Sequence, residues 1–129
     1  MADMLTFELV SPERMLASTE AEAVTIPAQL GEMTAMADHA PFLTTLRPGF
    51  VTVTGGEGGR YFVTGGFAEI SENTVSVLAE EAVPESEVST DWLGERIETA
   101  RKSVEEAGDE RRQIEAQRLA DLEAQAGAL

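Results

Sequence analysis

The sequence predicts a mainly β protein with α-helices, in which an N-terminal antiparallel two-sheet β-sandwich is followed by a C-terminal antiparallel two-helix hairpin. In the first part, short apolar or alternating runs rich in Val, Ile, Thr and aromatic residues are separated by turns containing Gly or Pro. From Thr90 onward the apolar residues recur at helical spacings and no proline occurs. We therefore predict two domains, residues 1–87 and 88–129.

The strands of the first domain are predicted from runs of about five to ten residues. Alternating valines, such as Val51 with Val53 and Val75 with Val77, leave one face for a core and the other for solvent. The glycine-rich TGGEGGR predicts a hairpin tip, and SENT predicts a compact polar turn. Many short, closely spaced strands are typical of an antiparallel sandwich or barrel. The runs are LTFELV, EAVTIP, GEMTAM, PFLTTL, GFVTVT, GRYFVT, GFAEIS and TVSVLAEEAV.

The second domain is predicted to be two helices joined by a turn at Gly108 and Asp109. Ser89 or Thr90 is the expected N-cap of the first helix. So short a turn requires the helices to fold back on each other as an antiparallel hairpin. The apolar stripe is thin and rich in alanine, so we expect the hairpin to depend on a neighbour for stability. The larger apolar residues at helical spacing are Trp92, Leu93, Ile97, Val104, Ile114, Leu119 and Leu122.

The composition excludes several classes of partner. The 129 residues include 24 acidic and 9 basic side chains, a formal net charge of -15. Such a surface repels phosphate backbones and anionic lipid headgroups, which argues against nucleic acid and direct membrane binding. No run approaches the roughly 20 apolar residues that span a bilayer, and MADMLTFEL does not resemble a signal peptide. If the protein serves a membrane, we expect it to dock on another component there.

Charge is divided along the same boundary as the fold. Residues 1–87 carry 14 acidic and 3 basic side chains, whereas residues 88–129 carry 10 acidic and 6 basic ones. One interpretation is an arm that meets acidic surfaces. The other is a set of solvated helix faces with ion pairs such as Glu98 with Lys102, each worth about 0.2–0.5 kcal/mol. Composition favours the second interpretation.

The motifs of known chemistries are absent from the sequence, so we predict no catalytic, metal or cofactor site. There is no GxSxG, no GxxxxGK[ST] and no HExxH, and no cysteine. GGEGG lacks the lysine of a phosphate-binding loop. Glu80 and Glu81 are expected to be neighbours in a strand and to point to opposite faces. His39, the only histidine, has no nucleophile or orienting partner that the sequence identifies.

Four ordered segments nevertheless form a specific series. They resemble the epsilon subunit of the bacterial rotary ATP synthase, whose mitochondrial counterpart is called delta. The resemblance spans the whole predicted sandwich and continues more weakly into the helical hairpin. In chain order the segments are FELVSPER, GEM with HAPFLTTLRPG, VTGGFAEI and TVSVLAEEA.

The resemblance implies a non-catalytic rotor subunit at the foot of the central stalk, bound to the gamma subunit and resting on the ring of c subunits. The sandwich of this family helps to couple proton-driven ring rotation to the gamma shaft and ATP synthesis. The hairpin can lie beside the sandwich or extend along gamma toward the alpha/beta head, where in many bacteria it inhibits hydrolysis. The implied location is peripheral, on the cytoplasmic face of the bacterial inner membrane.

The resemblance also implies where the partners are contacted. The ring-contacting loop of the family matches Glu32 and Met33, with His39 and Phe42 in the neighbouring loop and strand. Glu32 matches the acidic residue that faces the polar loop of the c subunit. Met33, Phe42 and Leu43 are expected to seal the core at that end, with Glu32 near His39. Before the histidine, many relatives have a proline and a glycine, where this sequence has Ala37 and Asp38.

The arm departs from the family in the segment that binds a regulatory ATP in many relatives. There, Asp91 is followed three residues later by Gly94 instead of arginine, and Arg96 comes late. We therefore predict no bound nucleotide and weak inhibition or none. The alternative is a nucleotide-sensing inhibitory module that acts through the hairpin. If the arm meets acidic segments of the beta subunit, the candidate residues are Arg111, Arg112 and Arg118.

Overall fold

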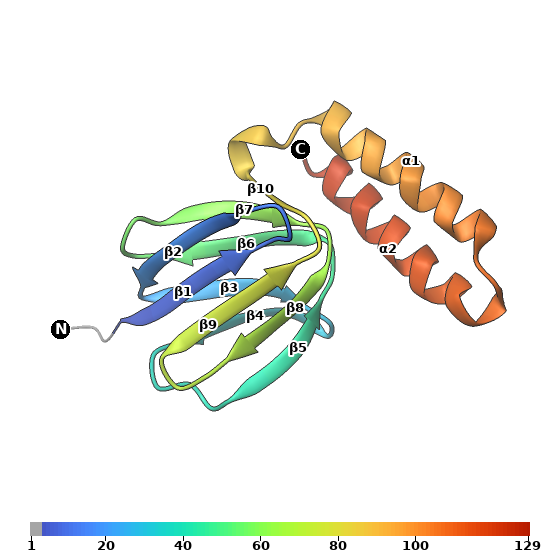
Figure 1. Ribbon diagram of the computed structural model, residues 1–129. Coiled ribbons are helices and arrows are strands. Elements are labelled where there is room, and N and C mark those ends of the chain that lie inside the picture. Colours follow the sequence, from blue (N-terminus) through green and yellow to red (C-terminus); the bar gives the residue numbers. More distant parts are fainter. Residues whose placement is uncertain (1–3) are drawn as a thin grey trace. The chain divides into compact units, whose positions relative to one another are not determined.

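The computed structural model describes residues 4–129 and divides the chain into two compact units, one ending at Glu85 and the other spanning Ser86–Leu129. The first unit consists of β-strands and the second of two helices (Figure 1). This arrangement confirms the predicted fold class. The strands are β1 (Leu5–Val10), β2 (Met15–Ala21), β3 (Ala23–Ala28), β4 (Gly31–Met36), β5 (Phe42–Leu46), β6 (Gly49–Thr54), β7 (Gly59–Val63), β8 (Gly66–Ile70), β9 (Thr74–Ala79) and β10 (Ala82–Pro84).

The ten strands form one continuous sheet that folds over on itself. Its order is β10-β7-β6-β3-β5-β8-β9-β1-β2, and β4 pairs with β3 outside this path. In Figure 1, β1, β8 and β9 lie in front of β3 and β4. One pair departs from the expected antiparallel pattern, because β1 and β9 run parallel. No hairpin links these two strands, so their relative direction is free of the constraint that a short turn imposes.

The core lies between the layers and follows the alternation that the sequence predicts. Leu5, Phe7 and Leu9 are buried along β1, and Val75 and Val77 are buried along β9. The buried residues of β3, β6, β8 and the end of β5 belong to the same apolar cluster. Each fully buried large side chain contributes about 1.5–3 kcal/mol relative to exposure, so this alternation supplies most of the stabilisation of the sandwich.

Two residues that were expected in the core lie outside it. Leu43 is 67% exposed, because it pairs with Glu69 on the outer face of the sheet. Phe42 is 40% exposed, because it begins β5 at the very end of the layer. Met33 does pack against the core, and Leu46 is the β5 residue that enters it.

The expected position of Glu80 and Glu81 is also wrong. They lie in the connection between β9 and β10 and not within a strand. The main chain of this connection is tied to the β7–β8 turn, because the Glu80 N–H donates to the Gly65 carbonyl and the Thr64 N–H donates to the Glu81 carbonyl. The alternation of side chains along a strand therefore does not determine the directions of these two carboxylates.

The second unit is the predicted helical hairpin. After the short 3-10 helix η1 (Glu85–Glu87) come α1 (Thr90–Glu106) and α2 (Asp109–Gly127). Of the two expected caps, Ser89 is the N-cap of α1, and its Oγ accepts a hydrogen bond of 3.0 Å from the Trp92 N–H. The helices lie antiparallel to each other (Figure 1), and their buried residues are Leu93, Ala100 and Leu122.

Gly66 offers a test of how closely the strands approach. Its φ is +127°, and a Cβ added there would lie 2.1 Å from the Leu78 carbonyl oxygen. Because both the backbone conformation and the contact oppose a side chain, we expect Gly66→Ala to lower the free energy of unfolding by at least about 2 kcal/mol. Urea unfolding followed by circular dichroism measures this loss.

Gly94 provides the matched control. It lies within α1, and a Cβ there would meet no atom within 4 Å. Gly94→Ala should therefore stabilise the helical unit by about 0.5–1 kcal/mol, since alanine is the better helix former. Equal destabilisation by both substitutions would contradict the described approach of β8 to β9.

Candidate functional site

Glu32 lies beside the tip of the β3–β4 hairpin. It is exposed and pairs with Pro27 across the two strands. Gln29 and Leu30 form the tip, and the Leu30 side chain is 100% exposed. Gly31 follows with a φ of +128°, a conformation that glycine adopts at little cost, so the chain turns here without strain. The tip therefore presents an apolar side chain next to a carboxylate.

The base of this tip is fixed by neighbouring strands. The Arg47 N–H donates to the Pro27 carbonyl at 2.9 Å, and Thr45 Oγ1 donates to Gln29 Oε1 at 3.1 Å. Ala28 also pairs with Leu46 of β5. These contacts connect the hairpin to both layers of the sandwich, so the position of Glu32 is set by the fold.

His39 lies in the connection between β4 and β5. Its N–H donates to the Glu72 carbonyl at 3.2 Å, and its Nδ1 donates to the Ala40 carbonyl at 2.7 Å. The preceding residue, Asp38, has a φ of +64°, and its N–H donates to Asn73 Oδ1. Aspartate tolerates this left-handed conformation better than most residues. The loop therefore keeps a glycine-like shape at the position where many relatives of the resembled family have glycine.

Glu32 and His39 are at opposite ends of β4, so the expectation that they share one end is wrong. Glu32 is the second residue of the strand, and the His39 loop begins only after Met36. Those four steps along an extended chain amount to about 13 Å. Met33 adjoins Glu32, whereas Phe42 pairs with Ile70 at the His39 end. The resemblance grouped the four residues in one contact region, but β4 separates them along its length.

An exposed apolar row crosses the outer face of four adjacent strands. Val10 pairs with Met15 on one side and with Leu78 on the other, and Leu78 pairs with Phe67. Met15 is 58% exposed, and Leu78 and Phe67 are each 44% exposed. We call these four residues the apolar row. The sequence patterns did not identify it, although its members occupy the outward phase of strands whose buried residues alternate with them.

The apolar row is bordered by acidic side chains. Two residues further along the same face, Glu8 pairs with Ser76, which pairs with Glu69. Neither this rung nor the apolar row contains a basic residue. At its other end the row meets Thr45, which pairs with Phe67 and also holds the β3–β4 tip. The face thus combines an apolar stripe with negative charge.

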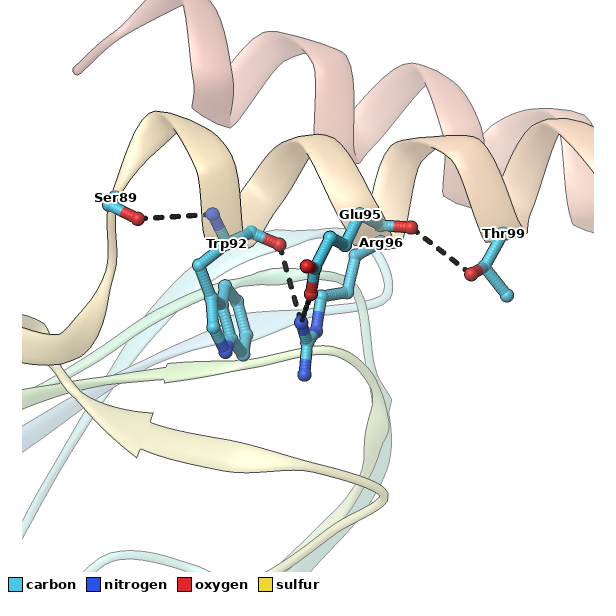
Figure 2. Close-up of polar contacts among 5 residues, drawn as sticks. All are labelled: Ser89, Trp92, Glu95, Arg96 and Thr99. Atoms are coloured by element: carbon cyan, nitrogen blue, oxygen red, sulfur yellow. Dashed lines mark hydrogen bonds and ion pairs between the residues drawn. The ribbon is translucent and has the colours of Figure 1, made fainter.

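At the start of the arm, Arg96 is held by its own helix. Its guanidinium carbon lies 4.0 Å from the centroid of the Trp92 ring. Arg96 Nη1 donates to the Trp92 carbonyl at 3.4 Å and to Glu95 Oε2 at 3.1 Å. Figure 2 shows the guanidinium and the indole side by side below α1. Arg96 is therefore engaged in stabilising the first turns of α1.

The arginines of α2 also make contacts within the arm. Arg111 Nη2 donates to Glu115 at 3.2 Å, and Arg112 Nη2 donates to the Ala107 carbonyl at 3.2 Å. Arg118 interacts with its surroundings as well. On α1, Glu98 forms an ion pair with Arg101 at 2.8 Å, where Lys102 had been expected. These contacts agree with the interpretation that the arm has solvated helix faces with ion pairs, which the composition favours.

Residues 4–129 contain neither a metal-binding cluster nor a membrane-spanning helix. Among these residues, no group of three or more His, Cys, Asp or Glu side chains is arranged to hold a metal ion. No helix within them combines the length and apolar character needed to cross a membrane. The described residues present an apolar row with an acidic border, and an anchored tip that carries Glu32.

The stack of Arg96 on Trp92 can be tested directly, because Trp92 is the only tryptophan in the chain. Arg96→Ala should change the Trp92 emission and lower the stability of the arm by about 0.5–1 kcal/mol, through loss of a cation–π contact. Urea unfolding followed by tryptophan fluorescence measures both. Arg101→Ala, which removes an arginine of the same helix, should leave the emission unchanged, and an equal change there would contradict the stack.

The chain is similar to known proteins over most of its length. Residues 4–85 match the family model of the ATP synthase delta/epsilon chain, beta-sandwich domain. An ATP synthase epsilon chain from Ruegeria sp. is 52% identical over 130 residues, covering 96% of this chain and 95% of the relative. An ATP synthase epsilon chain from Rhizobium meliloti is 48% identical over 124 residues, covering 95% and 92%.

Solved structures show the same fold. A chain of the Euglena gracilis mitochondrial ATP synthase, in a structure of OSCP, F1 and c-ring, matches with a TM-score of 0.72 and 27% identity, covering 97% of this chain and 81% of that one. A chain of the Tetrahymena thermophila central stalk and c-ring matches with a TM-score of 0.60, 95% and 96% coverage and 15% identity, which shows the fold alone. The resemblance predicted from the sequence is thus confirmed, and the chain belongs to the delta/epsilon chain family of ATP synthase.

Proposed function

We propose that this chain is a non-catalytic rotor subunit of the proton-translocating ATP synthase that couples rotation of the c-ring to the gamma shaft and to ATP synthesis. Membership of the family makes it a component of the synthase. The observation that carries the proposal is the apolar row, because its residues lie side by side on one face and three of them, Met15, Leu78 and Phe67, are exposed. Contiguous apolar surface of this kind marks a protein–protein contact.

In this proposal the gamma subunit covers the outer face of β1, β9, β8 and β5. The apolar row supplies the dry centre of the contact, and Glu8 and Glu69 favour basic side chains on gamma at its border. Leu43 extends the outer face of β5 toward the His39 end, and Phe42, which has the opposite phase, is partly exposed where the strand begins. His39 and Phe42 therefore belong to the far end of the gamma contact.

Glu32 and Met33 are proposed to face the c-ring. The support is the anchored tip, which holds Leu30 and Glu32 clear of the sandwich. A carboxylate there suits a c-subunit loop that carries basic groups. Because Glu32 and His39 lie at opposite ends of β4, the ring contact does not extend to His39.

The hairpin is proposed to be an arm that inhibits hydrolysis weakly or not at all. Arg96 is engaged with Trp92 and Glu95, which leaves it poorly placed to bind a nucleotide phosphate. Arg111, Arg112 and Arg118 remain the residues that would meet acidic segments of the beta subunit. The sandwich, residues 1–87, would supply the docking surface and residues 88–129 the arm. The complex would hold the chain peripherally at the cytoplasmic face of the bacterial inner membrane, without nucleic acid.

The apolar row can be tested by introducing charge. Leu78→Asp and Phe67→Asp should each weaken binding to gamma by at least about ten-fold, because the change removes apolar burial and buries a carboxylate at the centre of the contact. Co-purification with a gamma–c-ring subcomplex measures this. Ile114→Asp is the matched control, since Ile114 is a 63% exposed apolar residue of the arm. If the row variants bind like Ile114→Asp, the gamma contact lies elsewhere.

The two ends of β4 can be distinguished by cross-linking. A cysteine at Glu32 should form a disulfide with a cysteine in the polar loop of the c subunit, whereas a cysteine at His39 should not. The chain has no cysteine of its own, so each product is unambiguous. Cross-links from position 39 alone would place the opposite end of the sandwich on the ring.

A further inference from the structure

Arg60 of β7 makes three contacts on the outer face of the sandwich. Its guanidinium carbon lies 4.0 Å from the centroid of the Phe50 ring on β6. Its Nε donates to Thr52 Oγ1 at 3.4 Å, and its Nη1 forms an ion pair with Glu85 Oε2. Glu85 is 25 residues away in sequence, so the fold alone brings the two side chains together.

The platform under Arg60 contains an aromatic pair on neighbouring strands. Phe50 packs edge-on against Phe62, with ring centroids 5.2 Å apart and an interplanar angle of 80°. Phe62 is fully buried, and it pairs with Val83 of β10. Arg60 is therefore fixed by a strand ladder and an aromatic pair, which limits the positions that its guanidinium can take.

Glu85 is the residue at which the chain leaves the sandwich. β10 ends at Pro84, Glu85 begins η1, and the two compact units divide directly after it. Residues 1–87 contain only three basic side chains, and Arg60 is the one paired with Glu85. Arg60 thus places a positive charge at the root of the helical arm.

We propose that Arg60 is a latch that fixes the root of the arm: its ion pair with Glu85 holds the first residue of η1 on the sandwich, so that movement of the arm begins at Ser86. Without the pair, Glu85 is released and the pivot moves back toward Pro84. The arm then samples a wider range of orientations. This inference does not depend on which subunits the sandwich binds.

The absence of cysteine permits a direct measurement on the full chain. Glu72→Cys and Gln113→Cys, both at exposed positions, place one spin label on each unit, and electron–electron resonance gives the distribution of distances between them. Arg60→Gln should widen this distribution and raise the population of its minor orientations about two- to five-fold, the range expected for an exposed ion pair. In the labelled chain that keeps Arg60 and Glu85, 1 M NaCl should also widen the distance distribution, since salt screens the Arg60–Glu85 ion pair.

Two further variants make the test specific. Glu85→Gln leaves the stack of Arg60 on Phe50 in place and should widen the distribution as Arg60→Gln does. Arg101→Gln is the control, because the Arg101–Glu98 pair is similarly exposed, at 49% and 55% against 44% and 50%, but lies within one helix. Arg101→Gln should leave the distribution of distances between the two labels unchanged.

Three results would overturn the latch. The first is a distribution that neither Arg60→Gln nor Glu85→Gln alters. The second is widening by Arg60→Gln alone, which would assign the effect to the aromatic stack and not to the ion pair. The third is equal widening by Arg101→Gln, which would indicate a general effect of charge. Urea midpoints recorded on every labelled variant identify widening that comes from loss of the fold, and such widening also counts against the latch.

Discussion

Strand β3 is the element on which the sandwich depends, because it pairs with three other strands. β4 pairs along its whole length, β6 pairs with its first three residues, and Ala28 at its end pairs with Leu46 of β5. This last pair joins the two layers into one sheet, which lets Val24 and Ile26 enter a core shared with β1 and β9. The same junction anchors the tip that carries Glu32.

The alternation that builds the core also determines the apolar row. Once Leu9, Val77 and Ala68 point inward, their neighbours Val10, Leu78 and Phe67 must point outward, since successive side chains of a strand face opposite sides. Polar residues at these positions would leave the fold intact. Apolar residues there expose surface that folding alone does not cover, which is why the apolar row is better explained by a partner than by stability.

Several polar contacts described in the arm are local. Ser89 caps α1, Arg96 stacks on Trp92, and the ion pairs of both helices join residues three or four apart or adjacent. Such contacts form within one turn or two and contribute little individually. By contrast, the pair between Arg60 and Glu85 is long-range and belongs to the sandwich. The ion pairs described within the arm therefore join residues of one helix, whereas the Arg60–Glu85 pair joins two segments that are distant in sequence at the root of the arm.

The sequence by itself determined the elements whose cause is local. The period of the apolar residues indicated strands before residue 87 and helices after it, Ser89 was one of two expected caps, and four ordered segments identified the family. Tertiary structure alone decided which positions meet. Glu32 and His39 are close in sequence, yet β4 holds them at opposite ends, while Arg60 and Glu85 are far apart and form an ion pair. Likewise, Leu43 faces solvent and β1 runs parallel to β9, because strand partners and register depend on the whole sheet and not on any local pattern.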